Sequence, residues 1–405
     1  MDYLIIGMSA AGLSCMDTLL RVSPDSRITV VSGEKFPPYC RCLLTYCLSG
    51  KLREEQMIIR DPSSLPPNVR LIAGNDVVGL ETSGRKALLS SGEEIRYDRL
   101  LIATGAHAVK PGYADEQKRA FTLRGIDDAR KMAPFVKGKA AVLGGGFVGI
   151  KTALGLLERR VKVTMIISSA YPLSMVLDAG TGRFVERDLK ELGLQILTEE
   201  DITGLDMKDD AVRLSLKSGR ELEADAAVIG KGVAPRVSLA KKAGIRIDLG
   251  ITVNEYLETS SEGIYAAGDC CEAIDIARKR PWINAVWPVA VEQGYFAALN
   301  MAGIPSVYPG SIGVNSLKTP LFHLISGGIL KETEGVTIFE DYVPSTNQMR
   351  KLAVRENVPV GMAFYNSPED AGVVINLIKK GAPLAVHPEK IVKREASVMD
   401  VLKPL

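Results

Sequence analysis

The chain opens on a short apolar run that ends in a glycine-rich turn. Residues Tyr3 to Ile6 are hydrophobic, the turn GMSAAG follows, and apolar residues then recur with helical spacing from Leu13 to Leu20. Another apolar run covers Arg27 to Val31. Short continuous apolar runs are typical of buried parallel strands. The pattern therefore predicts a strand–helix–strand unit at the start of the chain.

The same pattern returns in the middle of the chain. The run from Lys139 to Leu143 is apolar after its first residue, the turn GGGFVG and a helical pattern follow it, and Val161 to Ile167 is apolar again. The strand, the turn and the helix come in the same order as before. We therefore predict a second strand–helix–strand unit, and this pair is the internal repeat of the chain.

Three other apolar runs end in small residues. Tyr97 to Gly112 contains a strand that ends in Ala103-Thr104-Gly105, Asp225 to Pro235 breaks into glycine and proline, and Ile264 to Ala267 leads into Gly268-Asp269. A strand that ends in small residues lets the backbone pass close to a ligand. The last of these runs delivers an aspartate that can accept hydrogen bonds from the hydroxyls of a polyol.

The remaining patterns complete the organisation of the chain. Val69 to Gly92 predicts alternating strands separated by the turns SGR and SSGEE, and Trp282 to Met301 predicts a long helix. From Tyr308 to Leu405 the sequence changes to short strands separated by Pro-Gly, Gly-Gly and Asn-Ser turns. This change predicts a separate C-terminal domain.

The two glycine-rich turns carry the residues that a bound pyrophosphate needs. In the first, Gly7 makes the tight turn, Ser9 is small enough for close approach of the backbone, and Gly12 lets the helix pack on the strand. The backbone N–H groups and the positive end of the helix dipole then face the anion. The second turn has glycine at all three positions, Gly144, Gly146 and Gly149.

The two units differ where a nucleotide ribose would bind. A dinucleotide site uses an acidic residue near the end of its second strand, and an arginine there accommodates the phosphate of NADP. Glu34 is the only nearby acid in the first unit, whereas the second strand of the second unit ends in Ser168-Ser169. The choice between NAD and NADP stays open, and the absence of an arginine cluster favours NAD.

Composition excludes several classes of protein. The chain has 405 residues, which predicts two or three domains, and its net charge of +2 favours neither nucleic acid nor a membrane surface as a partner. Six cysteines without a CxxC pair and three histidines argue against a metal site. Without a span-length apolar run or a signal-type N-terminus, we expect a cytoplasmic location.

Three cysteines fall within eight residues of the segment Phe36 to Gly50, namely Cys40, Cys42 and Cys47. Free cysteine packs like a small hydrophobic residue, which is the first interpretation. The second is a thiol placed over a cofactor ring and activated by the positive charge of Arg41. We expect the adjacent pair Cys270-Cys271 to be packed thiols.

These stretches, in this order and spacing, resemble the two-dinucleotide-binding-domain flavoproteins of the pyridine nucleotide–disulfide oxidoreductase superfamily, including NADH oxidases and the reductases of ferredoxin, rubredoxin and nitrite systems. The resemblance covers roughly residues 1–305. It implies that the first turn binds FAD, that the second binds NAD(H) or NADP(H), that Asp269 bonds the ribityl chain, and that Val77 contacts the adenine.

The resemblance also implies an α/β fold with two Rossmann-like, glutathione-reductase-like domains and a C-terminal α+β interface domain. The FAD-binding domain would comprise residues 1–111 and 237–307, the NAD(P)H-binding domain residues 112–236, and the interface domain residues 308–405. We expect a homodimer or a subunit of a redox complex. The candidate cofactor-binding residues are Gly7, Ser9, Ala10, Ala11, Gly12, Glu34, Arg41, Val77, Ala103, Thr104, Gly105, Gly268 and Asp269, with Gly144, Gly146, Phe147, Val148, Gly149 and Gly232 for the nicotinamide nucleotide.

Departures from the family pattern define the candidate catalytic residues. Ferredoxin reductases carry a lysine and a glutamate that pair beside the flavin, and this chain has Tyr46 and Lys151 at those positions. Alignment of Gly50 with the matching glycine of the NADH oxidases puts Cys42 on their redox cysteine, but the paired cysteines of the glutathione reductases are missing. Cys42, Tyr46 and Lys151 are therefore the catalytic candidates.

Three functions follow from this reading. The first is an FAD-dependent NAD(P)H oxidoreductase that exchanges electrons with an iron–sulfur or ferredoxin-like partner protein. The second is Cys42-dependent reduction of oxygen, peroxide, polysulfide or a small disulfide. The third is a flavin-bearing binding or regulatory subunit without NAD(P)H turnover, which the serines at the end of the second strand suggest.

Overall fold

The computed structural model of the chain describes every residue except 114, 116–117, 332–333, 398–399 and 401–405. Its contacts divide it into two compact units. The first unit comprises residues 1–40, 58–107 and 234–313, and the second comprises residues 41–57, 108–233 and 314–405. These units do not test the three-domain division expected from the sequence, which stays a prediction.

A five-stranded parallel sheet forms the centre of the first unit, in the order β19-β7-β1-β2-β3. Its strands are β1 (Asp2–Ile6), β2 (Arg27–Ser32), β3 (Val69–Ala73), β7 (Arg99–Ile102) and β19 (Ile264–Ala266). Strand β1 lies between β2 and β7, with Ile6 paired to both Val31 and Ile102. The strands are nearly continuous apolar runs because both faces of a parallel sheet are covered.

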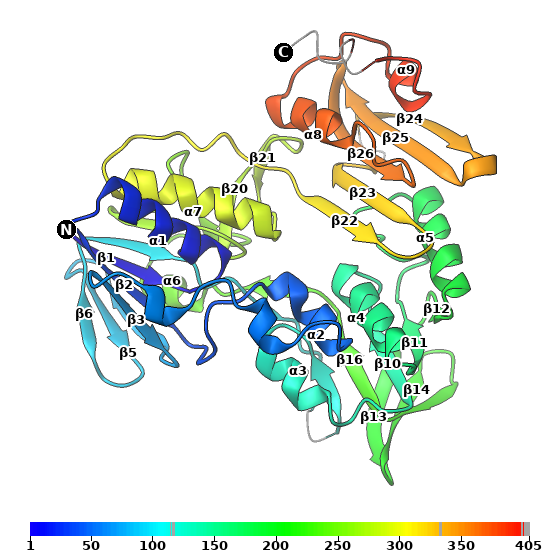
Figure 1. Cartoon of the computed structure of the whole chain (residues 1–405), viewed down its shortest axis with the longest axis horizontal. Helices are drawn as coiled ribbons and strands as arrows, with labels where there is room; N and C mark the ends of the chain where they lie inside the picture. The colour runs from blue at the N-terminus through cyan, green and yellow to red at the C-terminus, as the bar shows by residue number, and fades with distance from the viewer. Residues whose placement is uncertain (114, 116–117, 332–333, 398–399, 401–405) are drawn as a thin grey trace. The chain divides into compact units, whose positions relative to one another are not determined.

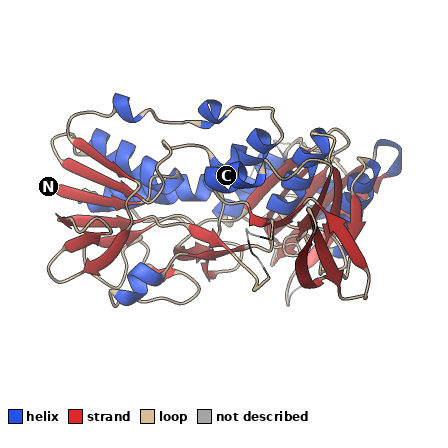
Figure 2. Cartoon of the chain, turned by 90° about the horizontal axis from the view of Figure 1, so that it is seen from below, coloured by secondary structure: helices blue, strands red, loops and turns tan. Residues whose placement is uncertain are grey.

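Helices α1 (Ala10–Val22) and α7 (Trp287–Met301) lie side by side on one face of this sheet (Figure 1). Figure 2 shows helices and strands as separate layers beside the N-terminus. The unit also contains α6 (Ser238–Lys242), η3 (Pro62–Ser64) and the antiparallel strands β4 (Val77–Glu81), β5 (Lys86–Leu89) and β6 (Glu94–Arg96). In a further three-stranded sheet, β20 (Cys271–Asp275) pairs antiparallel with β21 (Arg280–Trp282) and parallel with β18 (Ile251–Thr252).

Two helices begin at positions other than those expected. Helix α1 begins at Ala10 and not at Leu13, because alanine favours helix, and the last glycine of the turn, Gly12, lies inside its first turn. Helix α7 begins at Trp287, with a proline in its first turn, and Trp282 instead pairs with Ala273 in a β-ladder. The expectation of a helix from Trp282 was wrong by five residues.

A second parallel sheet in the second unit has the order β12-β11-β10-β16-β9. Its strands are β9 (Ala120–Thr122), β10 (Lys139–Leu143), β11 (Lys162–Ile166), β12 (Gln195–Leu197) and β16 (Ala226–Ile229). The helices of this region are α3 (Ile126–Met132), α4 (Phe147–Glu158) and α5 (Ala179–Glu191), and its antiparallel strands are β13 (Ile202–Lys208), β14 (Ala211–Leu216) and β15 (Glu221–Ala224). The strands β8 (Ala106–Ala108) and β17 (Val233–Pro235) form a two-stranded sheet.

The same unit contains an antiparallel sheet built from the C-terminal region, in the order β22-β23-β26-β25-β24. Its elements are β22 (Val314–Lys318), β23 (His323–Gly328), β24 (Thr337–Val343), η4 (Pro344–Thr346), β25 (Gln348–Arg355), β26 (Val358–Tyr365), α8 (Ala371–Lys380) and α9 (Pro388–Val392). Residues of this sheet share one hydrophobic core with α4, α5 and β10.

Residues 41–57, which include most of the cysteine-rich segment, form η1 (Arg41–Leu43), α2 (Leu44–Leu48) and η2 (Glu54–Met57) and belong to the second unit, whereas Cys40 belongs to the first. Helix α2 packs on α4 so closely that a Cβ on Gly155 would lie 2.9 Å from the Thr45 carbonyl oxygen. Lys51 adds an ion pair to Glu158 at 2.6 Å. The neighbour of α2 is thus α4, the helix that follows the second glycine turn.

Candidate functional site

The first glycine turn joins β1 to α1 with no room for side chains. Gly7 has φ of +116°, and a Cβ there would overlap the carbonyl oxygen of Ala103. A Cβ on Gly12 would in turn overlap the carbonyl oxygen of Gly7. Both positions therefore require glycine. The turn brings the backbone of β1, α1 and the end of β7 together at the carboxyl edge of the sheet.

The N-terminus of α1 offers its backbone N–H groups to a ligand. Its N-cap residue Ser9 is extended, makes no side-chain capping hydrogen bond, and is followed by no acidic residue in the first turn. The first N–H groups of a helix lack intrahelical partners, and the helix dipole favours an anion there. Ala10 and Ala11 add no bulk. This arrangement fits the pyrophosphate of FAD.

The expected ribose and adenine contacts lie beyond the next strands. Glu34 follows β2 and is half-buried, and its backbone is fixed by a hydrogen bond from its own N–H to Ser32 Oγ and by one from the N–H of Gly74 to its carbonyl. Val77 is the first residue of β4 and is also half-buried. Their roles in binding a nucleotide stay predictions.

Two further turns at the same edge of the sheet follow β7 and β19. Ala103 donates its N–H to the Ile6 carbonyl, Thr104 Oγ1 donates to the Arg236 carbonyl at 2.7 Å, and Gly105 has φ of +68°. After β19, Gly268 has φ of +81° and Asp269 is partly exposed. Asp269 lies in the second of these turns. Its expected contact with the ribityl chain of FAD stays a prediction.

Gln293 is a residue that the sequence reasoning did not assign to the site. Its side chain is 2% exposed, and its Oε1 accepts the N–H of Gly268 at 2.8 Å. It therefore fixes the turn that carries Asp269. A buried amide inside the mostly apolar helix α7 is the signal that identifies such a residue, because buried polar groups are hydrogen-bonded.

The second glycine turn repeats the first in detail. A Cβ on Gly144, which has φ of +113°, would overlap the Gly230 carbonyl oxygen, and a Cβ on Gly149 would overlap the Gly144 carbonyl oxygen. The N-cap Gly146 makes no side-chain capping bond, and no acid stands in the first turn of α4. Val148 is 48% exposed in that turn. The N–H groups of this helix are thus open to a second dinucleotide.

The second strands of the two strand–helix–strand units are followed by different side chains. Glu34 follows β2, whereas Ser168 and Ser169 follow β11. Ser168 is exposed, and Ser169 donates its hydroxyl to the Tyr171 carbonyl at 2.8 Å. Gly232 is exposed, with φ of +93°, next to a Lys231 that pairs with Asp201. Ser168 can hydrogen-bond either nucleotide, and its geometry does not select between them.

The catalytic candidates all lie in the second unit. Cys42 is exposed in η1, Tyr46 is 42% exposed in α2 under the Lys51 ammonium at 6.0 Å, and Lys151 is half-buried in α4. The guanidinium of Arg41 donates to the Arg124 carbonyl at 3.0 Å. The structure brings η1, α2 and α4 into one region of the unit, whereas the roles of the four side chains stay predictions.

The other cysteines lie in more covered positions. Cys15, Cys270 and Cys271 are buried, and Cys40 and Cys47 are intermediate. Burial raises the pKa of the Cys47 thiol, and the carboxylates of Glu54 and Glu55 raise it further. Burial also raises the pKa of Cys270 and Cys271, which are packed thiols as expected. Cys42 is thus the exposed thiol among the cysteines of the chain.

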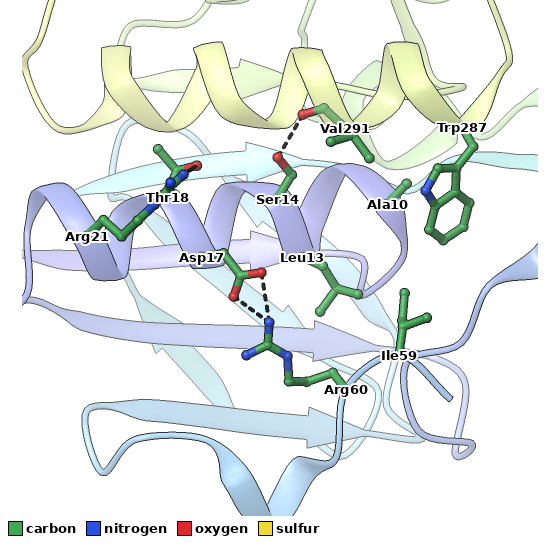
Figure 3. Close-up of a pocket in the computed structure, with 10 residues that line it drawn as sticks. All are labelled: Ala10, Leu13, Ser14, Asp17, Thr18, Arg21, Ile59, Arg60, Trp287 and Val291. Carbon is green, nitrogen blue, oxygen red and sulfur yellow. Dashed lines mark hydrogen bonds and ion pairs between the residues drawn. The ribbon is translucent and has the colours of Figure 1, made fainter. Parts of the chain in front are cut away.

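A pocket of about 610 Å³ lies on the first unit between α1, α7 and the segment after residue 57 (Figure 3). Asp17 and Arg60 pair across it at 2.8 Å, and Ser14 Oγ donates to the Val291 carbonyl at 2.7 Å. Of the predicted cofactor residues only Ala10 lines it. Within the described residues no cluster of potential metal ligands occurs, and no helix there is long and apolar enough to cross a membrane.

Comparison with known proteins identifies the family. The family model described as pyridine nucleotide-disulphide oxidoreductase matches residues 1–294. The assimilatory nitrate reductase electron transfer subunit of Bacillus subtilis is 27% identical over 97% of the chain and 51% of its own length. The NADH-rubredoxin oxidoreductase of Clostridium acetobutylicum is 30% identical over 83% of the chain and 84% of its own length.

A solved structure supports the same assignment. The NAD-dependent persulfide reductase from A. fulgidus has a TM-score of 0.87 and 28% identity, over 94% of this chain and 77% of that one. The predicted glutathione-reductase-like fold is confirmed. The chain spans about half the length of the B. subtilis nitrate reductase subunit and of the nitrite reductase from the same organism. Members of the family use FAD and NAD(P)H, as expected from the sequence. The chain belongs to the pyridine nucleotide-disulphide oxidoreductase family.

Proposed function

We propose that the chain is an FAD-dependent NAD(P)H oxidoreductase that passes electrons between the nicotinamide nucleotide and a separate redox protein of the iron–sulfur or ferredoxin-like kind. The observation that carries the proposal is the pair of glycine turns. Each ends a buried parallel strand and begins a helix without a side-chain cap or an acidic first turn. Two such anion sites in one chain suit two dinucleotides.

The residues of the chain bind and orient the two cofactors. Gly7 and Gly12 let the strand, the turn and α1 pack closely, which holds the first N–H groups of α1 in place for one pyrophosphate. Gly144 and Gly149 do the same for the other at α4. Gln293 holds the turn of Gly268 in place. When bound, FAD supplies the chemistry that links a two-electron donor to a one-electron acceptor. The protein contributes binding, orientation and exclusion of water.

The partner class is supported by what similar proteins are named for. The nitrate reductase relative is an electron transfer subunit, and the Clostridium relative acts on rubredoxin by name. Both names describe proteins that pass electrons to another redox component. We extend that partner class to this chain, together with a homodimeric or complex-bound state and a cytoplasmic location.

Cys42 supports a second candidate function. Among the six cysteines it is the exposed one, and it is adjacent to Arg41 in the sequence. In addition, a solved structure 28% identical to this chain is named a persulfide reductase. In this alternative, NADH and a proton reduce a small disulfide to two thiols and leave NAD⁺. A thiolate is the nucleophile of such exchange, and neighbouring positive charge favours it.

An anaerobic titration distinguishes the two functions. The purified protein is titrated with NADH and then with NADPH while the flavin spectrum is followed, for wild type, Cys42→Ser and Cys47→Ser. Electron transfer to a partner protein predicts complete bleaching by one nucleotide equivalent in all three proteins, and turnover with ferricyanide as a one-electron acceptor. For the thiol function, each protein is first treated with a small disulfide and the excess is removed. Thiol chemistry then predicts that wild type and Cys47→Ser carry a mixed disulfide on Cys42 and take up two further electrons to cleave it, whereas Cys42→Ser cannot form it.

Two results would contradict the proposal. If neither nucleotide bleaches the flavin, the chain is a flavin-bearing subunit without turnover, the third function considered from the sequence. If the protein is reduced but ferricyanide and added iron–sulfur proteins are not, the acceptor is not a one-electron partner. Cys47→Ser serves as the matched control because Cys47 lies five residues further along in the same segment and is less exposed.

A further inference from the structure

The segment between β11 and α5 closes on the second glycine turn. The N–H of Leu173 donates to the carbonyl of Gly145 at 2.8 Å, and a Cβ on Gly145 would lie 2.9 Å from the Ile167 side chain. Leu173 has φ of +58° and is only 3% exposed. A leucine adopts this backbone conformation only where its surroundings hold it. The segment that begins at the ribose position is thus fixed against the turn at one end.

Its other end is fixed by the first residue before α5. Asp178 is the N-cap of that helix, with its carboxylate accepting the N–H of Gly180 at 3.1 Å and the hydroxyl of Thr181 at 2.5 Å. The same carboxylate pairs with Lys351 of β25 at 2.7 Å, and Lys351 also pairs with Glu340 at 2.6 Å. The Lys351 side chain is 7% exposed, so this pair is largely removed from water.

Both groups of this pair are charged. Burial acts to raise the pKa of Asp178, but hydrogen bonds from Lys351 and Thr181 outweigh burial and lower it. Burial acts to lower the pKa of Lys351, but its hydrogen bonds to Asp178 and Glu340 outweigh burial and raise it. A buried ion pair adds little net stability compared with apolar side chains, yet the loss of one partner leaves the other charge uncompensated. Such a pair is better suited to fixing a position than to adding stability.

A second contact fixes α5 to the same sheet in its last turn. Asp188 is 2% exposed, and its two oxygens accept the Tyr365 hydroxyl at 2.5 Å and the Arg187 guanidinium at 2.6 Å. Arg187 also donates to the Asn347 side chain at 2.7 Å. The helix is therefore held at both its first and its last turns by residues of the C-terminal sheet.

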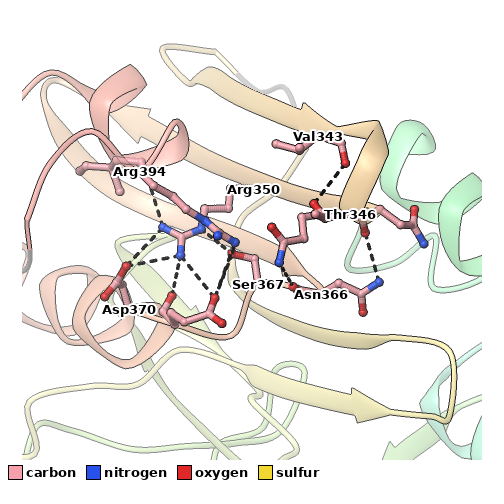
Figure 4. A network of polar contacts seen from close by, with 11 residues as sticks. Val343, Thr346, Arg350, Asn366, Ser367, Asp370 and Arg394 are labelled. Atoms are coloured by element: carbon pink, nitrogen blue, oxygen red, sulfur yellow. Dashed lines mark hydrogen bonds and ion pairs between the residues drawn. The ribbon is translucent and has the colours of Figure 1, made fainter.

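The strand that carries Lys351 is itself firmly held (Figure 4). The neighbouring Arg350 is 3% exposed and donates to Ser367 Oγ at 2.6 Å, to the Glu369 carbonyl at 3.0 Å and to Asp370 at 3.3 Å. Successive side chains of a strand point to opposite faces. Arg350 therefore anchors one face of β25 while Lys351 reaches α5 from the other.

We propose that Lys351 is a positioning residue for the nicotinamide nucleotide: through Asp178 it holds the segment from Ser168 to Leu177 against the second glycine turn, so that the C-terminal sheet sets the affinity for NAD(P)H. The inference rests on the proposed function of that turn. It assigns the C-terminal region a role in nucleotide binding, in addition to the interface role expected from the sequence. Lys351 does not touch the nucleotide and acts through the segment.

The test uses the full-length flavoprotein and three substitutions. Lys351→Met removes the charge and keeps an apolar side chain, Lys351→Arg keeps the charge, and Lys190→Met removes the exposed Lys190–Glu186 pair from the same helix as a control. With ferricyanide as acceptor, we expect Lys351→Met to raise KM for NADH about tenfold while kcat changes less than about twofold. Lys351→Arg restores much of the affinity, and Lys190→Met matches wild type.

A direct binding measurement separates positioning from general damage. Calorimetric titration with ADP-ribose, which lacks the nicotinamide, should show the same loss of affinity in Lys351→Met as NADH does, while the FAD content stays at the wild-type value. If Lys351→Met does not fold, Asp178→Asn replaces it, because asparagine still caps the helix but lacks the charge. An unchanged KM and an unchanged ADP-ribose affinity in a folded variant would overturn the inference.

The same experiment distinguishes a failure of this inference from a failure of the proposed function on which it rests. A wild-type protein that neither binds ADP-ribose nor accepts electrons from NADH or NADPH contradicts the proposed function and the role of Lys351 together. A wild-type protein with full turnover, beside a Lys351→Met variant with unchanged KM, contradicts only the role of Lys351. A fall in kcat at unchanged KM also overturns it, because positioning of the nucleotide segment acts on affinity.

Discussion

The two glycine turns are nearly the same in backbone, whereas the strand ends beside them carry different side chains. In both, a Cβ on the first glycine would overlap a carbonyl of a neighbouring strand end, and a Cβ on the last would overlap the carbonyl of the first. Yet the strand end beside the first turn carries Glu34, and the one beside the second carries Ser168. The shared part is the geometry for phosphate, and the different part is the contact to a ribose.

This comparison shows which features of a dinucleotide site are interchangeable. Pyrophosphate is bound by backbone N–H groups, so any such site needs the same close approach and the same glycines. A ribose is recognised by single side chains, which can change without disturbing the turn. The helices after the two turns are also alike in how they pack. Helix α1 contacts α7 at Gly294, and α4 contacts α2 at Gly155, and neither glycine leaves room for a side chain.

The largest expected effect comes from filling either turn. Gly12→Ala and Gly149→Ala each place a methyl group against a backbone carbonyl. Overpacking of this kind costs about 1–3 kcal/mol or more, and 3 kcal/mol is roughly a hundredfold in affinity. We expect Gly12→Ala to purify without flavin, and Gly149→Ala to keep its flavin but lose reduction by NADH. Flavin absorbance and stopped-flow reduction measure the two effects.

The control for both substitutions is Gly372→Ala. Gly372 lies in the first turn of α8, where no atom lies within 4 Å of an added Cβ. It should therefore keep both the flavin and its reduction. Loss of flavin from Gly149→Ala with retention in Gly12→Ala would reverse the assignment of the two turns to FAD and NAD(P)H.

The turns were predictable from the sequence, and the residues that support them were not. A glycine turn is a local pattern, because the apolar strand, the tight turn and the helix are continuous in the chain. The contact between Asp178 and Lys351 joins residues 173 positions apart, and no local pattern indicates it. Gln293 was visible as a polar residue in an apolar helix, but its target Gly268 is defined only by the fold.

Errors in the expected elements have the same origin. The expected helix from Trp282 rested on apolar spacing, which does not show that Trp282 finds a ladder partner in Ala273. The expected start of α1 at Leu13 counted only large apolar residues, whereas Ala10 and Ala11 are already helical and buried. Cys42 was first interpreted as core packing, and it is exposed, so that interpretation was wrong for this cysteine.

A smaller effect tests the position at which the turns differ. Ser168→Asp gives the second strand end the carboxylate that Glu34 provides for the first. A carboxylate accepts hydrogen bonds from the ribose hydroxyls of NAD and repels the phosphate of NADP. A hydrogen bond to a charged group contributes about 1.5–3 kcal/mol, so we expect the ratio of kcat/KM for NADH over NADPH to rise about tenfold.

The reciprocal variant is Glu34→Gln. It should weaken retention of the flavin while leaving the ratio between NADH and NADPH at the wild-type value, because Glu34 belongs to the first unit. A ratio that does not move in Ser168→Asp would mean that the nucleotide ribose lies elsewhere. A change in the NADH/NADPH ratio of kcat/KM in Glu34→Gln would contradict the assignment of FAD to the first turn and of the nicotinamide nucleotide to the second.

Each parallel sheet has an aspartate just before the strand that follows its central strand in the sheet order, β7 beside β1 and β16 beside β10. Asp98 precedes β7 and accepts the N–H of Asp2 at 2.7 Å, and Asp225 precedes β16 and accepts the N–H groups of Gly138 at 2.6 Å and Lys139 at 2.9 Å. Burial acts to raise the pKa of Asp225, but these backbone donors outweigh burial and lower it. The second sheet thus has the better-bonded carboxylate of the two.

The smallest predicted effect is therefore on stability and depends on pH. The pKa of Asp225 is depressed on folding, so its contribution is present above its unfolded pKa of about 3.9 and is lost as pH falls through the folded pKa. We expect Asp225→Asn to lose about 1 kcal/mol at pH 7, which lowers the melting temperature by roughly 2 °C. The exposed turn variant Asp209→Asn should match wild type. Thermal melts at pH 7, 5 and 3 measure the difference, and a gap between Asp225→Asn and wild type that stays constant down to pH 3 would show that the carboxylate charge contributes nothing.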